Sequence, residues 1–303
     1  MKKIILVAGA TGNLGERIVK SLLQKDVEVR VVVRQSSDIE KVNALEKLGA
    51  TVYQLDNWNV AELTAACTDV SCVVSALAGL REVVIDAQKI LLDAAIAANV
   101  PRFIPSDYSL DFTKFSAGEN RNLDLRREFH TYLDSRPIKA TSIFNGAFAE
   151  LLTGEMPLIL FKQKLVLYWG SADHKMIFTT MDNTAEYTAN AAVDDSAPRY
   201  LRIAGDKISP REIRAVVARV TGDKYKFIRT GGQGFLGRII KIARKFAPGE
   251  KELYPAWQGM QYMHNMVDDR SNIITLDNNR YLGIKWTTAE DVLKQHQASL
   301  TNK

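Results

Sequence analysis

Two patterns of hydrophobic residues alternate along the first half of the chain. Short runs of aliphatic residues, typical of strands buried on both faces, recur between segments whose apolar residues follow helical spacing. The runs predict strands at Lys3–Ala8, Val27–Val33, Thr51–Leu55, Val70–Ser75, Arg102–Pro105 and Ala140–Phe144. The intervening segments predict helices at 13–24, 39–48, 60–66, 81–98 and 123–133. This alternation predicts an α/β fold, a Rossmann-type doubly wound parallel sheet.

After Phe148 the alternation becomes less regular. The pattern predicts strands at 165–169, 175–179, 199–203 and 225–229, and helices at 182–192, 210–220, 235–246 and 288–296. We therefore expect an NADP(H)-binding domain over residues 1–150, to which 182–203 returns. Most of 151–303 is expected to form a smaller C-terminal α/β lobe for substrate or partner binding.

Composition and charge narrow the class of protein. The 303 residues are 46% hydrophobic and 25% charged, as is typical of a soluble globular protein with a large core. The net charge is +5, but the cations are spread along the chain, so no nucleic-acid partner is expected. No apolar stretch is long enough to span a membrane, and we expect no membrane partner and a cytoplasmic location. Cys67 and Cys72 are interpreted as reduced packing residues, and the scattered histidines predict no metal site.

A glycine-rich turn follows the first predicted strand. Gly9, Gly12 and Gly15 have the spacing GxxGxxG and stand at the start of a βαβ unit. The first glycine permits a sharp turn, the second leaves room for a pyrophosphate, and the third lets the helix pack against the strand. The free N–H groups of the helix then face the phosphates. We expect a dinucleotide to contact Gly9, Thr11, Gly12, Asn13, Leu14 and Gly15.

The end of the second strand indicates which dinucleotide binds. NAD sites usually place a carboxylate there for the ribose 2′-hydroxyl. Here the strand ends at Arg34, Ser36 follows, and the first carboxylate is Asp38. A guanidinium beside hydroxyl groups suits a 2′-phosphate, which predicts NADP(H). The alternative is that Arg34 is an ordinary solvated surface residue.

Several segments together carry a family resemblance. They are Val7–Gly15, Val33–Arg34, Val73–Ala76, Arg102–Tyr108, Asp182–Ala185 and Ile203–Asp206. To about residue 220 the chain resembles the NmrA-like and isoflavone-reductase-like branch of the atypical short-chain dehydrogenase/reductases. The resemblance implies a Rossmann core, NADP(H), and a variable C-terminal lobe over the nicotinamide. With the rule that ligands bind at the carboxyl edge of such sheets, we add Ser75, Ala76, Pro105 and Ser106 to the expected cofactor contacts.

The catalytic group implied by the resemblance is altered. Isoflavone-reductase-like enzymes use a lysine on the helix predicted at 123–133, and this chain has Arg126 there. Arginine stays protonated and cannot act as a general base, but it can polarise a carbonyl or hold a phosphate. The alternative is a helix-surface arginine beside Asp124 and Arg127.

Other catalytic candidates lie near the fifth strand. Ser106 can orient the substrate or the nicotinamide ribose, although a turn hydroxyl is the alternative. Tyr108 can donate a proton, although packed tyrosines are more common. His130 lies one helical turn after Arg126, and Lys114 is a possible loop acid. Both are weaker candidates.

Two features of the lobe remain open. In 235–246, Phe235, Ile239, Ile242 and Phe246 share one side and basic residues the other. A membrane or partner surface is possible, but we interpret the segment as a lobe helix packed on the core. The motif GxGxxG at 232–237 has no following βαβ unit and is interpreted as the entry to that helix. The Met- and aromatic-rich segment 257–266 can line a pocket or pack in the core.

Two functions are consistent with these features. The first is an NADPH-dependent oxidoreductase that reduces a small apolar or aromatic carbonyl, enone or quinone. The second is a non-catalytic NADP(H) redox sensor that acts on a regulatory protein partner. Arg126 in place of lysine favours the second, and a pocket at 257–266 favours the first. The oligomeric state is left open.

Overall fold

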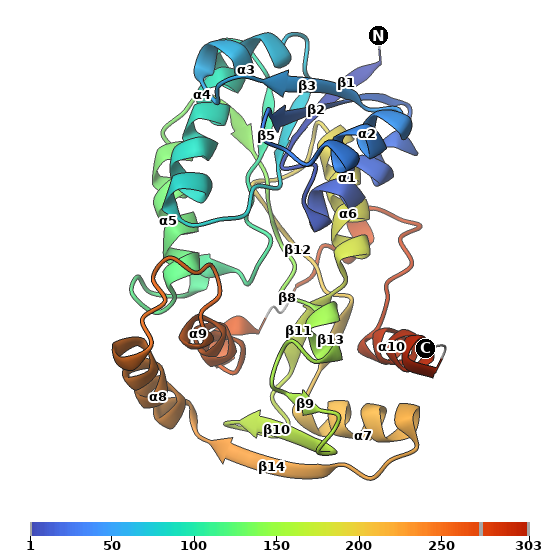
Figure 1. Ribbon diagram of the computed structural model, residues 1–303, viewed down its shortest axis with the longest axis vertical. Coiled ribbons are helices and arrows are strands. Elements are labelled where there is room, and N and C mark those ends of the chain that lie inside the picture. Colours follow the sequence, from blue (N-terminus) through green and yellow to red (C-terminus); the bar gives the residue numbers. More distant parts are fainter. Residues whose placement is uncertain (1, 273–274, 302–303) are drawn as a thin grey trace.

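A six-stranded parallel sheet organises the N-terminal half of the molecule (Figure 1). The computed structural model describes residues 2–272 and 275–301. The strand order is β3-β2-β1-β4-β5-β6, and the strands are β1 Lys3–Ala8, β2 Val27–Arg34, β3 Thr51–Leu55, β4 Cys72–Ser75, β5 Arg102–Ile104 and β6 Lys139–Ala140. The order reverses between β1 and β4, where ligands bind in doubly wound sheets. The predicted Rossmann-type fold is confirmed.

Helices cover both faces of this sheet. One face carries α1 Asn13–Leu23, α2 Ile39–Lys47 and α6 Met181–Val193. The other carries α3 Val60–Ala66, α4 Gln88–Ala97 and α5 Arg121–Leu133. A π-helical segment, η1 Glu82–Ala87, precedes α4, so the single helix predicted at 81–98 has two parts.

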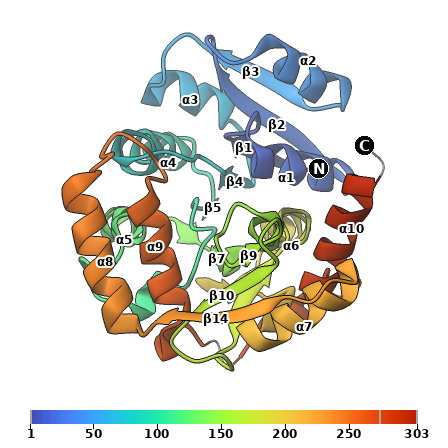
Figure 2. The same ribbon diagram turned by 60° about the horizontal axis from the view of Figure 1, so that its bottom comes forward.

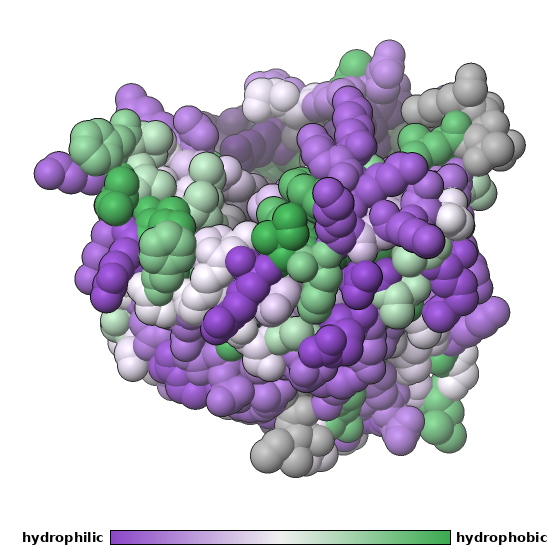
Figure 3. Space-filling view, turned by 90° about the horizontal axis from the view of Figure 1, so that it is seen from below, coloured by the Kyte–Doolittle hydropathy of each residue, from purple (hydrophilic) through white to green (hydrophobic). Residues whose placement is uncertain are grey.

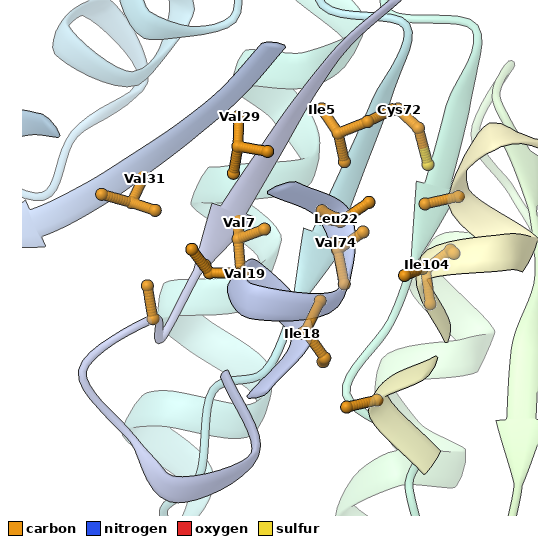
Figure 4. Close-up of a cluster of buried hydrophobic side chains, with 14 of the residues drawn as sticks. Ile5, Val7, Ile18, Val19, Leu22, Val29, Val31, Cys72, Val74 and Ile104 are labelled. Carbon is orange, nitrogen blue, oxygen red and sulfur yellow. The ribbon is translucent and has the colours of Figure 1, made fainter. Parts of the chain in front are cut away.

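The core explains why the strands are apolar without alternation. Ile5, Val7 and Val74 of the sheet pack against Ile18 and Leu22 of α1 (Figure 4). Because helices lie on both faces, the alternate side chains of each strand are buried too. The two cysteines are free and buried, one on each side of the sheet. Burial raises the pKa of both thiols to about 12, as expected of packing residues.

In the part of the chain that the structure describes, the lobe is built from short strands and four helices. Its strands are β7 Ser142–Phe144, β8 Ala147–Phe148, β9 Ile159–Leu160, β10 Leu165–Trp169, β11 Met176–Thr179, β12 Tyr200–Arg202, β13 Asp206–Ile208 and β14 Lys226–Gly231. Its helices are α7 Pro210–Thr221, α8 Gln233–Phe246, α9 Ala256–Met266 and α10 Ala289–Thr301, and short helical turns lie at η2 Phe112–Lys114, η3 Ala149–Thr153, η4 Asp269–Ser271 and η5 Asn278–Arg280. The strand predicted at Ala140–Phe144 is divided, because Ala140 ends β6 whereas Ser142–Phe144 pairs with β12.

Helix α9 connects the lobe to α5 (Figure 2). Asn120, the N-cap of α5, donates to the side-chain oxygen of Asn265 at 3.0 Å and accepts from Gln258 at 2.8 Å. All three amides are almost completely buried. Buried amides need such partners, so these bonds fix the position of α9 against α5, the helix that carries Arg126.

Candidate functional site

Glycine is required at two positions of the turn after β1. Gly9 has φ +83°, and a Cβ there would lie 2.6 Å from the Ala76 carbonyl oxygen. A Cβ on Gly15 would lie 2.1 Å from the Gly9 carbonyl oxygen. Both distances are far shorter than real Cβ contacts, so a side chain would push β1, β4 and α1 apart. The glycines thus bring the start of α1 to the carboxyl edge of the sheet.

The start of α1 suits an anionic ligand. Its N-cap, Gly12, offers no side chain to satisfy the first-turn N–H groups. The first intrahelical bond runs from Glu16 N to Gly12 O at 2.9 Å, so the N–H groups of Asn13, Leu14 and Gly15 precede it. Gly12 and Asn13 are exposed. Uncapped N–H groups and the positive end of the helix dipole fit the pyrophosphate of a dinucleotide.

Two cations lie where a ribose 2′-phosphate is expected. Arg34 is exposed at the end of β2, with its guanidinium 5.7 Å from the Trp58 ring. Lys41 of α2 reaches the turn, with Nζ 3.4 Å from Thr11 O. Asp38 caps α2, because its carboxylate accepts from Glu40 N at 2.9 Å. The first carboxylate after Arg34 in the sequence is therefore engaged in capping α2, and the site fits NADP(H) better than NAD(H).

Sequence reasoning missed Lys41. Its signal was available, because it stands in the first turn of the helix that follows Arg34. A small hollow between the turn and α2 is lined by Ala10, Thr11, Glu16, Lys41 and three further α2 or adjoining residues. Ser36 is exposed two residues after Arg34, and its contact with the 2′-phosphate stays a prediction.

The remaining expected cofactor contacts lie at the ends of β4 and β5. Ser75 is fully buried, and its hydroxyl has no partner among the described residues. Ser106 forms hydrogen bonds through its side chain and through its backbone. Its hydroxyl donates to Leu77 O at 2.6 Å, and its N–H donates to Gln88 Oε1 at 2.9 Å. Ser106 thus holds the two loops together, and its oxygen can still accept a bond from a ligand.

Arg126 faces this edge from α5. Its Nε donates to Ser106 O at 3.2 Å and its Nη1 to Asn122 O at 2.9 Å. Nη2 has no partner in the part of the chain that the structure describes. The half-buried guanidinium is thus held in place with two N–H groups to offer.

Tyr262 of α9 lies on the same side of α5. Burial raises the pKa of its phenol, and the Arg126 charge and the Asn122 side chain only partly offset this. The phenol therefore keeps its proton at neutral pH. Arg126 and Tyr262 together can stabilise negative charge on a substrate oxygen and supply a proton. Sequence reasoning missed this pair, because it depends on how α9 docks.

Tyr108 does not lie with Arg126 and Tyr262. It is buried in the core beside Ile104 and Ala185, on the face covered by α1 and α6. Helix α5, with Arg126, covers the opposite face. Burial also raises the pKa of the Tyr108 phenol. Tyr108 is thus packed on the face opposite to Arg126, and its expected role as proton donor stays a prediction.

The two weaker candidates, Lys114 and His130, also have hydrogen-bond partners outside the candidate site. Lys114 donates to Asn272 O at 3.0 Å. His130 Nε2 lies 2.6 Å from Asp107 Oδ2, which also accepts from the Ser142 hydroxyl at 2.6 Å. Arg199 approaches the other imidazole nitrogen at 3.1 Å. His130 thus belongs to a buried polar network and not to the candidate site.

This network gives a testable effect on stability. Burial alone would raise the pKa of Asp107, but the His130 charge and the bonds from His130 and Ser142 outweigh it, so the pKa is lowered. A lowered pKa stabilises the fold at pH above the ordinary value of 3.8, and this contribution is lost as pH falls further. We expect Asp107→Asn to cost about 3 kcal/mol at pH 7.

Urea unfolding at several pH values tests this expectation. The difference between wild type and Asp107→Asn should shrink below pH about 4, because protonation removes the same charge. The exposed Asp26→Asn is the control and should change stability by less than about 0.5 kcal/mol. The same cost at pH 3 and at pH 7 would contradict the account.

Two features are absent from the described ranges, 2–272 and 275–301. No group of three His, Cys, Asp or Glu side chains is arranged to hold a metal ion. No helix there is both long and apolar enough to cross a bilayer.

Comparison with curated proteins identifies reductases among the relatives. Pinoresinol reductase 1 of Arabidopsis thaliana is 26% identical over 314 residues, covering 97% of this chain and 96% of that protein. Pinoresinol reductase 2 of the same plant is 28% identical, with the same coverage. Both alignments extend through the lobe as well as the Rossmann core.

Comparison with solved structures and family models gives a consistent result. The structure of AtPrR2 with NADP⁺ and (+)-pinoresinol has a TM-score of 0.77 and 25% identity, covering 98% of this chain and 99% of that one. An isoflavone reductase has a TM-score of 0.81 at 17% identity, which supports the fold. NADP⁺ in the first structure agrees with the cofactor predicted here. The NmrA-like family model matches residues 1–272. The chain belongs to the NmrA-like family.

Proposed function

We propose that this protein is an NADPH-dependent oxidoreductase that reduces small aromatic substrates at a carbonyl, enone or quinone group. The observation that carries the proposal is the uncapped start of α1, with Arg34 and Lys41 beside the same turn. The relatives named as pinoresinol reductases support an aromatic substrate. A cytoplasmic location and a regulatory protein partner remain predictions.

Some residues of the site bind the cofactor, and others act on the substrate during reduction. When bound, NADPH supplies the hydride. The N–H groups at the start of α1 hold the pyrophosphate, and Arg34 and Lys41 hold the 2′-phosphate. Arg126 offers its free Nη2 to the substrate oxygen on which negative charge develops. Tyr262 donates the proton that this oxygen then takes up.

Tyr262→Phe is expected to lower kcat about 100-fold and to leave the affinity for NADPH unchanged. The substitution removes only the hydroxyl and keeps the packing of the ring. Stopped-flow NADPH oxidation and NADPH fluorescence titration measure the two quantities. Tyr254→Phe is the control, since Tyr254 is 64% exposed. An unchanged kcat would assign proton donation to solvent or to another group.

NADPH oxidation measured against aromatic and other apolar quinones, enones and aldehydes tests the proposed function. We expect turnover with at least one aromatic member of the panel. The second candidate is the redox sensor, which Arg126 favours because a guanidinium cannot act as a base. Tight NADP⁺ binding without turnover on any compound would favour the sensor.

A further inference from the structure

Helix α8 has apolar side chains on two faces. Leu236 and Ile240 are buried, on the face that packs toward α9. Phe235, Ile242 and Phe246 are 52%, 58% and 78% exposed. The helical pattern predicted that this second set packs on the core, and that prediction is wrong. The lobe buries the stripe that contains Leu236 and Ile240 instead. Figure 3 shows exposed apolar side chains gathered at the left of the lower face, where α8 lies.

The surroundings of the exposed stripe are strongly basic. Residues 224–249 include seven Lys or Arg side chains and no Asp or Glu. At about 100° per residue, Arg238, Lys241 and Lys245 fall beside the stripe, on the side away from α9. Arg244 pairs with Glu250 at 3.2 Å, but neither Arg238 nor Lys241 has an acidic partner among the residues described. The neighbouring strand β14 adds exposed Lys226 and Arg229.

We propose that this face, formed by α8 and β14, docks on an anionic lipid bilayer. Exposed Phe and Ile side chains beside unpaired cations are what a helix lying in the plane of a membrane surface requires. The apolar side chains enter the headgroup boundary, and the cations are attracted to anionic lipid. A second copy of this chain is a poorer occupant, because a symmetric contact would bring the seven cations of each copy together.

Vesicle co-sedimentation tests this proposal independently of any enzymatic activity. We expect wild type to bind phosphatidylcholine vesicles containing 30% phosphatidylglycerol, and to bind pure phosphatidylcholine vesicles at least tenfold more weakly. Binding should fall as salt rises. Ile242→Ser with Phe246→Ser should weaken it at least tenfold. Lys241→Gln with Lys245→Gln should weaken it about 25-fold, which is about fivefold for each cation.

Matched substitutions elsewhere serve as controls. Leu282→Ser removes an 89% exposed apolar side chain, and Lys47→Gln with Lys162→Gln removes two exposed cations outside this face. Both controls should bind vesicles as wild type does. Absence of binding at low salt, or equal losses in the α8 variants and the controls, would overturn the proposal. A dimer in sedimentation velocity that Ile242→Ser with Phe246→Ser dissociates, without vesicle binding, would overturn it in favour of self-association.

Discussion

Arg126→Ala is expected to lower kcat/KM about 10²–10³-fold on any substrate that the protein reduces. The guanidinium is held by Ser106 O and Asn122 O, so it is already oriented before the substrate binds. Such a donor needs no reorganisation as negative charge develops on the substrate oxygen. NADPH affinity should change little, because Arg126 donates to two backbone carbonyl oxygens and not to the turn or the cations that are expected to hold the phosphates. Steady-state kinetics with the best substrate of the panel measure the effect.

Two further variants make this prediction specific. Arg126→Lys keeps a cation and should recover part of the lost activity, although one ammonium cannot reproduce both backbone bonds and the free Nη2. Arg219→Ala, on the exposed side of α7, should leave kcat/KM unchanged. If Arg126→Ala keeps wild-type kcat/KM, the guanidinium has no part in the reaction, and our account of the site is wrong.

Arg34→Ala combined with Lys41→Ala is expected to weaken NADP⁺ binding about 10²- to 10⁴-fold. Each substitution removes a charge-assisted bond to the 2′-phosphate, worth about 1.5–3 kcal/mol. NAD⁺ lacks that phosphate, so its affinity should change less than about threefold. Calorimetric titration of NADP⁺ and NAD⁺ against the variant and wild type measures both.

A control for this prediction distinguishes a contact with the 2′-phosphate from a general effect of positive charge on cofactor binding. Lys47→Ala removes an exposed cation from the end of the same helix and should leave the preference for NADP⁺ intact. If Arg34→Ala and Lys41→Ala weaken both cofactors equally, they act on the turn or on the pyrophosphate, and the 2′-phosphate assignment fails.

The Rossmann core was predictable because its signals are local. Buried parallel strands are continuous apolar runs, and a GxxGxxG turn has few other uses at the end of a first strand. The NADP(H) preference was also predictable, since Arg34 is the last residue of β2. These features depend on neighbours within about 30 residues, as a βαβ unit does.

The site beyond the cofactor depends on distant contacts. Tyr262 reaches the vicinity of Arg126 only because α9 is bound to Asn120 through Gln258 and Asn265. No local pattern shows which face of α5 or α9 this docking covers. The position of Tyr108 also depends on distant contacts, because α6 returns from far along the chain to cover it. The buried face of α8 was predicted wrongly because the helix has two apolar stripes. Only the packing of the lobe determines which of them is buried.

Calorimetric titration of the wild-type protein with NADP⁺ and with NAD⁺ tests the central claim most directly. The account predicts one NADP⁺ site per chain and at least tenfold weaker binding of NAD⁺, because the uncapped start of α1 binds both pyrophosphates but only NADP⁺ presents a phosphate to Arg34 and Lys41. Equal affinities for the two cofactors, or no binding of either, would contradict it.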